Sequence, residues 1–381
     1  MSLLSLASAA LLSLMLGVAL WNLLAAPRLE RAGNPRAFPP VSLLVPARNE
    51  AVNLRETLPA LLGLDYPHLE ILVLDDGSTD DTAALVDALT RASDGRIRRL
   101  SGSALPPGWL GKSWACHHLA EAARGEVLVF CDADVTARPD ALRNTVAAME
   151  SVGAGALTAL PRQRLGGWAE SAVVPLVAQL PVLALLPLPL VPRVRAPSLS
   201  MANGQWLAFT REAYRACGGH AAVRVEVVED VALGRRVKAA GHRLLPVVST
   251  SLLEVRMYRD AAALREGFGK NLFALTGGRP APFLAALFLF ALVAVHPWAG
   301  VMLGAPGALL PLVLLAAVRT CGALLFRHGL RSVLLHPAGS LLLVGIALES
   351  FAGARRGALV WKGRRIALAP EEARPAPTNA S

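Results

Sequence analysis

The hydrophobic pattern of this chain alternates between long uncharged stretches and one stretch of short apolar runs. Leu3 to Ala26 carries no charge and is long enough to cross a bilayer as a helix. It lacks the basic start of a signal peptide, which favours an uncleaved anchor. Apolar segments of spanning length return near 281–303, 306–326 and 333–353. The pattern predicts an anchor at 1–27, a globular domain at 28–275, a membrane region at 276–365 and a disordered tail at 366–381.

Inside the globular stretch, apolar runs of strand length alternate with segments of helical periodicity. Strand, loop and helix repeat four times in about 110 residues, which predicts an α/β domain with a mostly parallel sheet. No G-x-G-x-x-G follows the first strand, which counts against a dinucleotide dehydrogenase. The expected strands are 41–45, 69–74, 96–100, 127–131, 155–160 and 243–248, and the expected helices include 112–123, one from Pro139, 210–217 and 229–240.

Residues 171–192 are apolar but are interrupted by four prolines at 175, 181, 187 and 189. Because proline removes a helical hydrogen bond, a straight spanning helix is not expected here. The segment is predicted to form short helices in the membrane interface, with a buried helical hairpin as the alternative.

Two helix starts carry capping signals. Asn49 precedes a helical pattern that ends before Gly63, and Ser78 and Asp81 have the spacing of a capping box. Both are expected to cap the helices that follow them.

Composition and charge limit the classes of molecule that this protein is expected to bind. The 381 residues are 54% hydrophobic and only 17% charged, and the formal net charge is +10. The positive charge suggests phosphate groups or an anionic membrane surface as partners. Nucleic acid is not expected, because no basic helix or zinc spacing occurs. The four cysteines are widely spaced and are expected to be buried thiols.

The arginines also predict membrane topology. Arg28, Arg31 and Arg36 follow the first apolar stretch, so the positive-inside rule places the globular domain in the cytoplasm of a multi-pass protein of the cell membrane. Three full crossings after residue 281 would then place Arg355 and Arg356 outside. We therefore expect one segment, 333–353, to be re-entrant or interfacial.

Three acidic sites stand out at the ends of predicted elements. Asp75-Asp76 ends the second strand, Asp132-Ala133-Asp134 ends the strand 127–131, and Glu229-Asp230 begins a helix. Ligands bind at the carboxyl ends of strands in open α/β sheets. In an extended segment, Asp132 and Asp134 would point the same way, toward one hard cation or sugar. Each pair alone could instead cap a helix or complement its dipole, so the weight rests on all three together.

The chemistry differs among the three sites. A carboxylate of Asp75 or Asp76 can accept hydrogen bonds from a base or ribose. Asp132 and Asp134 offer the oxygen ligands that Mg²⁺ or Mn²⁺ prefers when it also binds a diphosphate. Asp230 can act as a general base, and the helix dipole is expected to keep it ionised.

These motifs together resemble a known family. VPARNE (45–50), LDDGSTDDT (74–82), FCDADV (130–135) and VVEDVALGRRVKAAGH (227–242) look like an inverting family 2 glycosyltransferase of the GT-A fold. The likeness covers about residues 41–250. It implies a membrane-anchored transferase that moves a sugar from a nucleotide diphosphate, expected to be a UDP-sugar, to a lipid acceptor.

The resemblance also implies roles for individual residues. By this resemblance, the residues that bind the donor are Ala47, Glu50, Asp75 or Asp76, Lys112 and Asp132. Asp132 and Asp134 would bind the divalent metal, Mg²⁺ or Mn²⁺. Asp230 would be the catalytic base. Lys112, in GWLGKSW, matches the family's G-K and would lie near the diphosphate, or else be a solvated surface lysine. Candidate acceptor or phosphate contacts are Glu229, Trp206, Arg256 and Arg259, which could also be ordinary interfacial or flanking residues.

One departure from the family pattern limits the class of acceptor substrate that we expect. The Q-x-x-R-W motif of processive polysaccharide synthases does not occur between 231 and 381. NGQWLAFTREAYRACGGH (203–220) and RMYRD (256–260) instead resemble the membrane-bound glycosyltransferases of hopanoid and carotenoid pathways. The competing functions are a polyprenyl-phosphate sugar transferase, a polysaccharide-synthase-like transferase and an inactive membrane scaffold.

Overall fold

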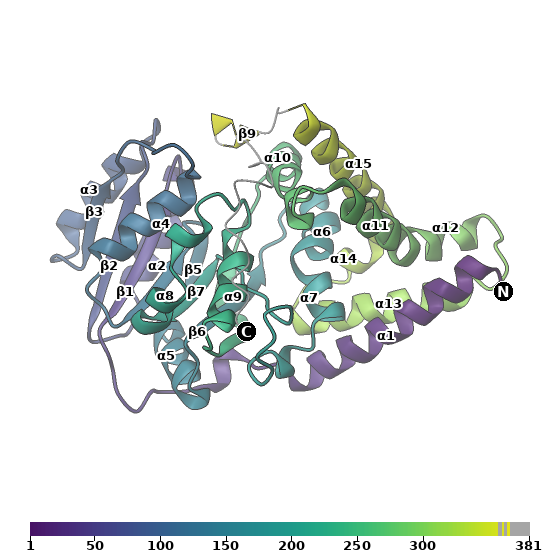
Figure 1. Ribbon diagram of the computed structural model, residues 1–381, viewed down its shortest axis with the longest axis horizontal. Helices are drawn as coiled ribbons and strands as arrows, with labels where there is room; N and C mark the ends of the chain where they lie inside the picture. Colours follow the sequence, from purple (N-terminus) through teal and green to yellow (C-terminus); the bar gives the residue numbers. More distant parts are fainter. Residues whose placement is uncertain (357–359, 362–363, 366–381) are drawn as a thin grey trace. The chain divides into compact units, whose positions relative to one another are not determined.

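The computed structural model describes residues 1–356, 360–361 and 364–365, and the chain packs as two compact units (Figure 1). The unit that contains the sheet, here called the sheet unit, comprises Pro27–Arg162 and Leu190–Val255. The other, the helical unit, comprises Met1–Ala26, Gln163–Pro189 and the described residues from Arg256 onward. The predicted tail, 366–381, lies outside the described residues.

The sheet unit is built on an eight-stranded mixed sheet of order β3-β2-β1-β4-β7-β6-β8-β5. Its strands are β1 Val41–Ala47, β2 Leu69–Asp75, β3 Ile97–Ser101, β4 Val127–Cys131, β5 Val135–Ala137, β6 Ala156–Gln163, β7 Trp206–Thr210 and β8 Leu244–Val255. Its helices are α2 Ala51–Leu62, α3 Thr82–Ala92, α4 Gly111–Ala122, α5 Ala141–Val152, α8 Arg211–Ala216 and α9 Glu229–Ala239.

The first four strands are parallel, as the repeated strand–helix pattern predicts. β1, β2 and β4 are buried on both faces, which is why they read as continuous hydrophobic runs. The expected α/β fold class and the strand at 127–131 are confirmed. The second half of the sheet is antiparallel, with β7 pairing against both β4 and β6.

Two strands are not evident from the sequence. The last residue of β7, Thr210, was expected to begin a helix, but it is the N-cap of a helix that begins one residue later, at Arg211. β5 is only three residues long and pairs with β8, which extends to Val255. Pairing partners far along the chain decide both strands, so a local pattern does not reveal them.

The two expected helix caps are wrong. α2 begins after Glu50, and Asn49, at φ 53°, instead accepts a hydrogen bond from the Thr79 backbone N–H. The N-cap residue of α3, Asp81, makes no capping bond with its side chain, and the Ser78 hydroxyl accepts from the Asn49 N–H. The two polar loops thus bond to each other, which fixes the loop after β1 against the loop after β2.

Helices make up most of the helical unit (Figure 1). They are α1 Leu3–Ala25, α6 Trp168–Val174, α7 Leu180–Leu185, α10 Ala261–Asn271, α11 Pro280–Phe290, α12 His296–Met302, α13 Leu309–Leu325, α14 Arg331–Leu334 and α15 His336–Arg355, and β9 Val360–Trp361 pairs with β10 Arg364–Arg365. Within the described part of the chain, four helical runs could cross a membrane by length and composition: Leu3–Ala25, Trp168–Leu185, Pro280–Met302 and His336–Arg355.

The expected break of the 171–192 segment into short helices is wrong for its first part. A π-helical turn, Pro175–Gln179, joins α6 to α7, so that Trp168–Leu185 is one helical run. The wider π turn accommodates a proline that an α-helix would not tolerate. The run ends before Pro187. Its place in a membrane interface stays a prediction.

Polar side chains stabilise the helical unit from within. Asn22 on α1 donates to the carbonyls of Leu183 and Leu186, each at 2.8 Å. Ser8 donates to the carbonyl of Leu292, within a second π-helical turn, Ala291–Val295. These bonds satisfy backbone carbonyls at the end of α7 and in the second π turn, where no water would be present in a bilayer. All four cysteines are free and buried, as expected.

Candidate functional site

The carboxyl ends of three neighbouring parallel strands form one edge of the sheet unit. Ala47 at the end of β1 is in register with Asp75 at the end of β2. β4 lies on the other side of β1 and ends at Cys131, directly before Asp132. Parallel strands therefore bring the sequence motifs at 45–50, 74–82 and 130–135 to the same edge, where open α/β sheets bind ligands.

At the first acidic site, the two aspartates differ in their bonding. Asp75 accepts the Ser78 N–H at 3.0 Å and so closes the turn after β2. Arg48 donates to the Asp76 carbonyl and has its guanidinium 4.0 Å from the Asp76 carboxylate. Gly102 approaches so closely that an added Cβ would lie 3.0 Å from Asp75 O. Asp75 thus shapes the loop, while Asp76 faces a cationic side chain.

The other two expected donor residues of this motif lie on the same edge. Ala47 is buried, and its carbonyl accepts the Asp76 N–H at 2.8 Å. Glu50 accepts a hydrogen bond from the Asn53 amide at 2.7 Å, and its own N–H is held by Thr82. The charge of Glu50 also raises the pKa of Asp134, so the structure brings the first and second acidic motifs close to each other.

Asp132 and Asp134 do not lie on an extended strand, as strand alternation would require. Ala133 and Asp134 form a turn, closed by the Val135 N–H donating to the Asp132 carbonyl at 3.1 Å. The two carboxylates are nevertheless close enough to interact, because the Asp132 charge raises the pKa of Asp134. The turn, and not strand alternation, brings them together.

The chemistry of this pair fits a divalent cation. Asp134 Oδ1 is buried and has no hydrogen-bond partner. Burial, with added repulsion from Asp132 and Glu50, raises the pKa of Asp134 to about 8. A cation would remove the cost of holding these acids together. Across the described residues, no group of three or more histidine, cysteine or acidic side chains is arranged as a metal site. Diphosphate and water would complete the ligand set.

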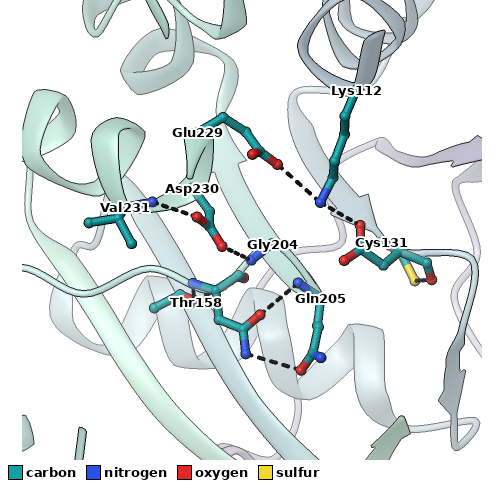
Figure 2. A network of polar contacts seen from close by, with 10 residues as sticks. Lys112, Cys131, Thr158, Gly204, Gln205, Glu229, Asp230 and Val231 are labelled. Carbon is teal, nitrogen blue, oxygen red and sulfur yellow. Dashed lines mark hydrogen bonds and ion pairs between the residues drawn. The ribbon is translucent and has the colours of Figure 1, made fainter. Parts of the chain in front are cut away.

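Lys112 joins the second acidic site to the third. Its Nζ lies 2.9 Å from Asp132 Oδ1 and 3.0 Å from Glu229 Oε1 (Figure 2). Burial alone would lower the pKa of Lys112, but Asp132 and Glu229 outweigh it and raise the pKa well above its usual value. Lys112 is therefore not a freely solvated surface lysine.

Asp230 is held by backbone donors at the start of α9. Its Oδ2 accepts the Gly204 N–H and its Oδ1 accepts the Val231 N–H, both at 2.8 Å (Figure 2). Lys112, Asp132, Glu229 and Asp230 line a small pocket, together with Gly204 and His220. The carboxylate is thus fixed in orientation beside a cavity.

Asp230 is ionised at neutral pH, as expected, but burial has a larger effect on its pKa than its place at the start of a helix. Burial, together with the Glu229 charge, raises the pKa of Asp230 to about 6. The group is still mostly ionised at neutral pH, and a base is most effective when its pKa lies near the working pH. For Glu229, burial would raise the pKa, but the ion pair with Lys112 outweighs it and lowers the pKa. Asp230 is therefore suited to accept a proton, whereas Glu229 is suited to remain charged in its ion pair with Lys112.

Of the candidate acceptor contacts, Trp206 is wrong. Its side chain is fully buried at the start of β7, and its indole N–H donates to Thr145 at 3.0 Å inside the domain core. Arg256 lies in the helical unit, where it pairs with Glu170 at 3.4 Å. A role for Arg256 or Arg259 in binding stays a prediction.

The turn 203–205 belongs to the site, although sequence reasoning did not assign it there. Asn203 is held by Thr158, and its amide bonds to Gln205 (Figure 2). Gly204 donates to Asp230, while the Gln205 carbonyl accepts the Asp132 N–H at 3.2 Å. This turn thus connects the backbone of the second acidic motif to the carboxylate of the third. The only sequence signal is the N-G dipeptide, which marks a turn.

Comparison with known proteins agrees with this geometry. The family model described as Glycosyl transferase family 2 matches residues 42–230, from β1 to Asp230. The chain is 26% identical over 347 residues to 4,4'-diaponeurosporenoate glycosyltransferase of Staphylococcus aureus strain MRSA252, covering 87% of this chain and 89% of that protein. The same enzyme from strain USA300 is 25% identical over 346 residues, with the same coverage.

Among solved structures, a mannosyltransferase from Pyrobaculum calidifontis, in complex with GDP-Man and Mn²⁺, is similar in fold. The TM-score is 0.54 at 20% identity, over 92% of this chain and 98% of that one. The mixed α/β sheet of the sheet unit is thus the expected GT-A fold.

Proposed function

Because the chain is a glycosyltransferase of family 2, we propose that it transfers a sugar from a nucleotide diphosphate to an apolar lipid acceptor, with inversion at the anomeric carbon. The observation that carries the proposal is the set of four charged groups around one pocket: Lys112, Asp132, Glu229 and Asp230. A site with a lysine and metal-type acids on one side and an oriented base on the other suits a displacement that expels a diphosphate.

The donor would lie along the edge formed by the ends of β1, β2 and β4. Asp75 or Asp76 and Glu50 would contact the nucleoside, and Asp132 and Asp134 would hold a Mg²⁺ or Mn²⁺ ion that neutralises the diphosphate. The mannosyltransferase of similar fold was solved with a nucleotide sugar and Mn²⁺, which supports this donor class. A UDP-sugar is our proposal for the donor.

Asp230 would take the proton of the acceptor hydroxyl as that oxygen attacks. Its two backbone hydrogen bonds, from Gly204 and Val231, fix the carboxylate without using a side chain. One in-line attack with one base gives inversion.

A second acceptor class is favoured by the name of the staphylococcal relative. 4,4'-Diaponeurosporenoate is, by its chemical ending, the anion of a carboxylic acid. An acceptor of this kind, like a polyprenyl phosphate, is already ionised near neutral pH and needs no base. Sensitivity to the loss of Asp230 therefore distinguishes a hydroxyl acceptor from an anionic one.

An inactive scaffold and a processive polysaccharide synthase both lose support. A scaffold conflicts with membership of an enzyme family whose three acidic motifs are all present. A processive synthase is disfavoured because Q-x-x-R-W is absent from 231–381.

Lipid glycosylation can be tested directly. The purified protein is incubated with membrane lipid extract and a panel of radiolabelled nucleotide sugars. Transfer of label into the lipid phase is expected, because an apolar acceptor carries the sugar with it. Label recovered only as free sugar would contradict the proposal.

The apolar helices support a location in the cell membrane. Four runs are long enough to span, and an apolar acceptor partitions into the bilayer. The arginines at 28, 31 and 36 favour a cytoplasmic sheet unit facing an anionic membrane surface.

The direction of α15 bears on the expected membrane topology. Its first residue, His336, contacts the Ala294 carbonyl in the middle of the Pro280–Met302 run, whereas Phe351 stacks on Phe283 near the start of that run. Arg265, which precedes the run, pairs with Glu349 at 2.5 Å. α15 therefore runs antiparallel to Pro280–Met302 and returns to the side from which that run departs. α13 lies alongside α1, because the Ser2 N–H donates to the Pro306 carbonyl at one end while Asn22 and Gly322 both lie next to Leu183 at the other. α15 instead begins beside the middle of the Pro280–Met302 run, so an incomplete crossing by 333–353 remains our proposal.

Cysteine labelling tests this topology. With the native cysteines replaced, a cysteine at Arg356 is expected to react with a membrane-impermeant maleimide only after the cells are opened. A cysteine at Leu303, which is 85% exposed at the far end of the Pro280–Met302 run, should react in intact cells and serves as the control. Labelling of the Arg356 site in intact cells would show that α15 crosses fully to the outside.

The titration of Asp230 predicts the pH dependence of the reaction. With its pKa at about 6, the base form dominates above about pH 7 and is lost below. kcat/KM should therefore be level at neutral pH and fall about tenfold per pH unit below about pH 6. A profile that stays level down to about pH 4.5, measured with the donor saturating, would exclude Asp230 as the base.

A further inference from the structure

Glu229 is buried next to the proposed base but has no part in the proton transfer. It is the first residue of α9 and only 7% exposed. Its carboxylate points toward Lys112, away from Asp230, and lies 3.0 Å from the ammonium group (Figure 2). Lys112 in turn reaches Asp132, so Glu229 is connected through this lysine to the acids that fit a metal.

We propose that Glu229 is a positioning residue that acts through Lys112: it holds the ammonium group where the leaving diphosphate of the donor will lie. The inference rests on the proposed function. It differs from the sequence-based expectation that Glu229 contacts the acceptor or a phosphate directly.

The flexibility of Lys112 gives the physical reason. A lysine side chain has four rotatable bonds, and fixing it in one place has an entropic cost at the moment of binding. The Lys112 side chain is 41% exposed, so packing alone does not fix it. An ion pair to a buried carboxylate at the start of a helix orients the ammonium group before the donor arrives.

The second partner of Lys112 cannot serve as the lasting anchor. Asp132 lies 2.9 Å from the ammonium group, but it also belongs to the pair of acids that fits a metal ion. A cation at Asp132 and Asp134 would compete with Lys112 for the same carboxylate. Glu229 lies outside that pair, so its bond to Lys112 can persist when the donor site is filled.

Gly204 lies directly beside the ammonium group of Lys112. A Cβ at this glycine would lie 3.0 Å from Lys112 Nζ and 3.5 Å from Asp230 Oδ2. The backbone of the 203–205 turn therefore lies directly beside both charged groups. A Lys112 side chain that releases Asp132 would remain between Glu229 and the position of the diphosphate.

A double-mutant cycle on nucleotide binding tests the proposal. Titration calorimetry would measure the Kd of UDP and of GDP, with Mg²⁺, on the full chain in detergent. Lys112→Met is expected to raise the Kd of the preferred diphosphate about 10- to 100-fold, because a charge-assisted bond is lost. Glu229→Gln keeps the lysine but frees it, and should raise the Kd about 3- to 10-fold.

The double variant, with Lys112 and Glu229 both replaced, shows whether the role of Glu229 is indirect. In the K112M background, E229Q should add no further loss, because the group that Glu229 positions is already gone. The corresponding nucleoside monophosphate lacks the second phosphate and should bind all variants alike. Glu226→Gln, three residues earlier and with no side-chain contact to the site in the described chain, is the matched control and should leave every Kd unchanged.

Two outcomes would contradict the inference. Equal losses from E229Q with and without K112M would mean that Glu229 acts independently of Lys112, while the proposed function would stand. An unaltered protein that binds no nucleoside diphosphate would overturn both. If E229Q does not fold, Glu229→Asp retains the charge with a shorter reach, and its smaller loss should likewise vanish in the K112M background.

Discussion

Replacing Asp230 by asparagine is expected to lower kcat by about 10²- to 10⁴-fold, the range typical of a lost general base. Asparagine keeps the size of the side chain but cannot accept the acceptor's proton. Because Asp230 is held by the Gly204 and Val231 backbone and not by a donor-binding residue, the Kd of the nucleotide should barely change. Single-turnover transfer to the lipid acceptor, alongside calorimetry of nucleotide binding, measures the two effects separately.

The control for this variant is Asp94→Asn, which makes the same chemical change at an exposed turn between α3 and β3. It should leave kcat and Kd unchanged. A D230N enzyme within a few-fold of the unaltered protein would point to an acceptor that arrives already ionised, as a carboxylate or phosphate does. A product that retains the anomeric configuration of the donor would exclude the single inverting step.

Loss of the metal site is expected to abolish transfer. Excess EDTA should stop the reaction and added Mg²⁺ or Mn²⁺ should restore it, because a hard cation neutralises the charge that develops on the leaving diphosphate. Asp134→Ala should be inactive under all of these conditions. Activity that persists in excess EDTA would remove the metal from the mechanism.

Thermal unfolding provides a readout of the metal site that does not depend on turnover. Asp134 Oδ1 is buried without a hydrogen-bond partner, and an unsatisfied buried acceptor costs about 1–3 kcal/mol. Asp134→Ala should therefore have a Tm equal to or above that of the unaltered protein without metal. Mn²⁺ should raise the Tm of the unaltered protein but not of the variant. A variant that melts lower would mean that its inactivity reflects unfolding.

The sequence alone determined the strand–helix repeat and the place of the acidic motifs. β1, β2 and β4 are buried on both faces, so their runs of apolar residues are visible without knowledge of any partner. Acids that directly follow such strands must lie at one edge once the strands pair in parallel. Asp75, Asp132 and their neighbours could therefore be assigned to one site from spacing alone.

Tertiary structure decided the contacts that make this edge a site. Nothing local indicates that Lys112 joins Asp132 to Glu229, because the three residues come from separate parts of the chain. The same holds for Gly204 and Asp230, which meet only after β7 pairs with β4. Burial likewise raised the pKa of Asp230 against the effect of its helix dipole, since desolvation depends on everything packed around the group.

Two local signals were overridden for the same reason. Trp206 was a candidate acceptor contact, but cross-strand pairing with Cys131 places it inside the core. Asn49 and Ser78 have the chemistry of helix caps, yet they bond to each other's loops because β1 and β2 end side by side. Short polar side chains take the nearest backbone donor, and only the packed chain determines which donor that is.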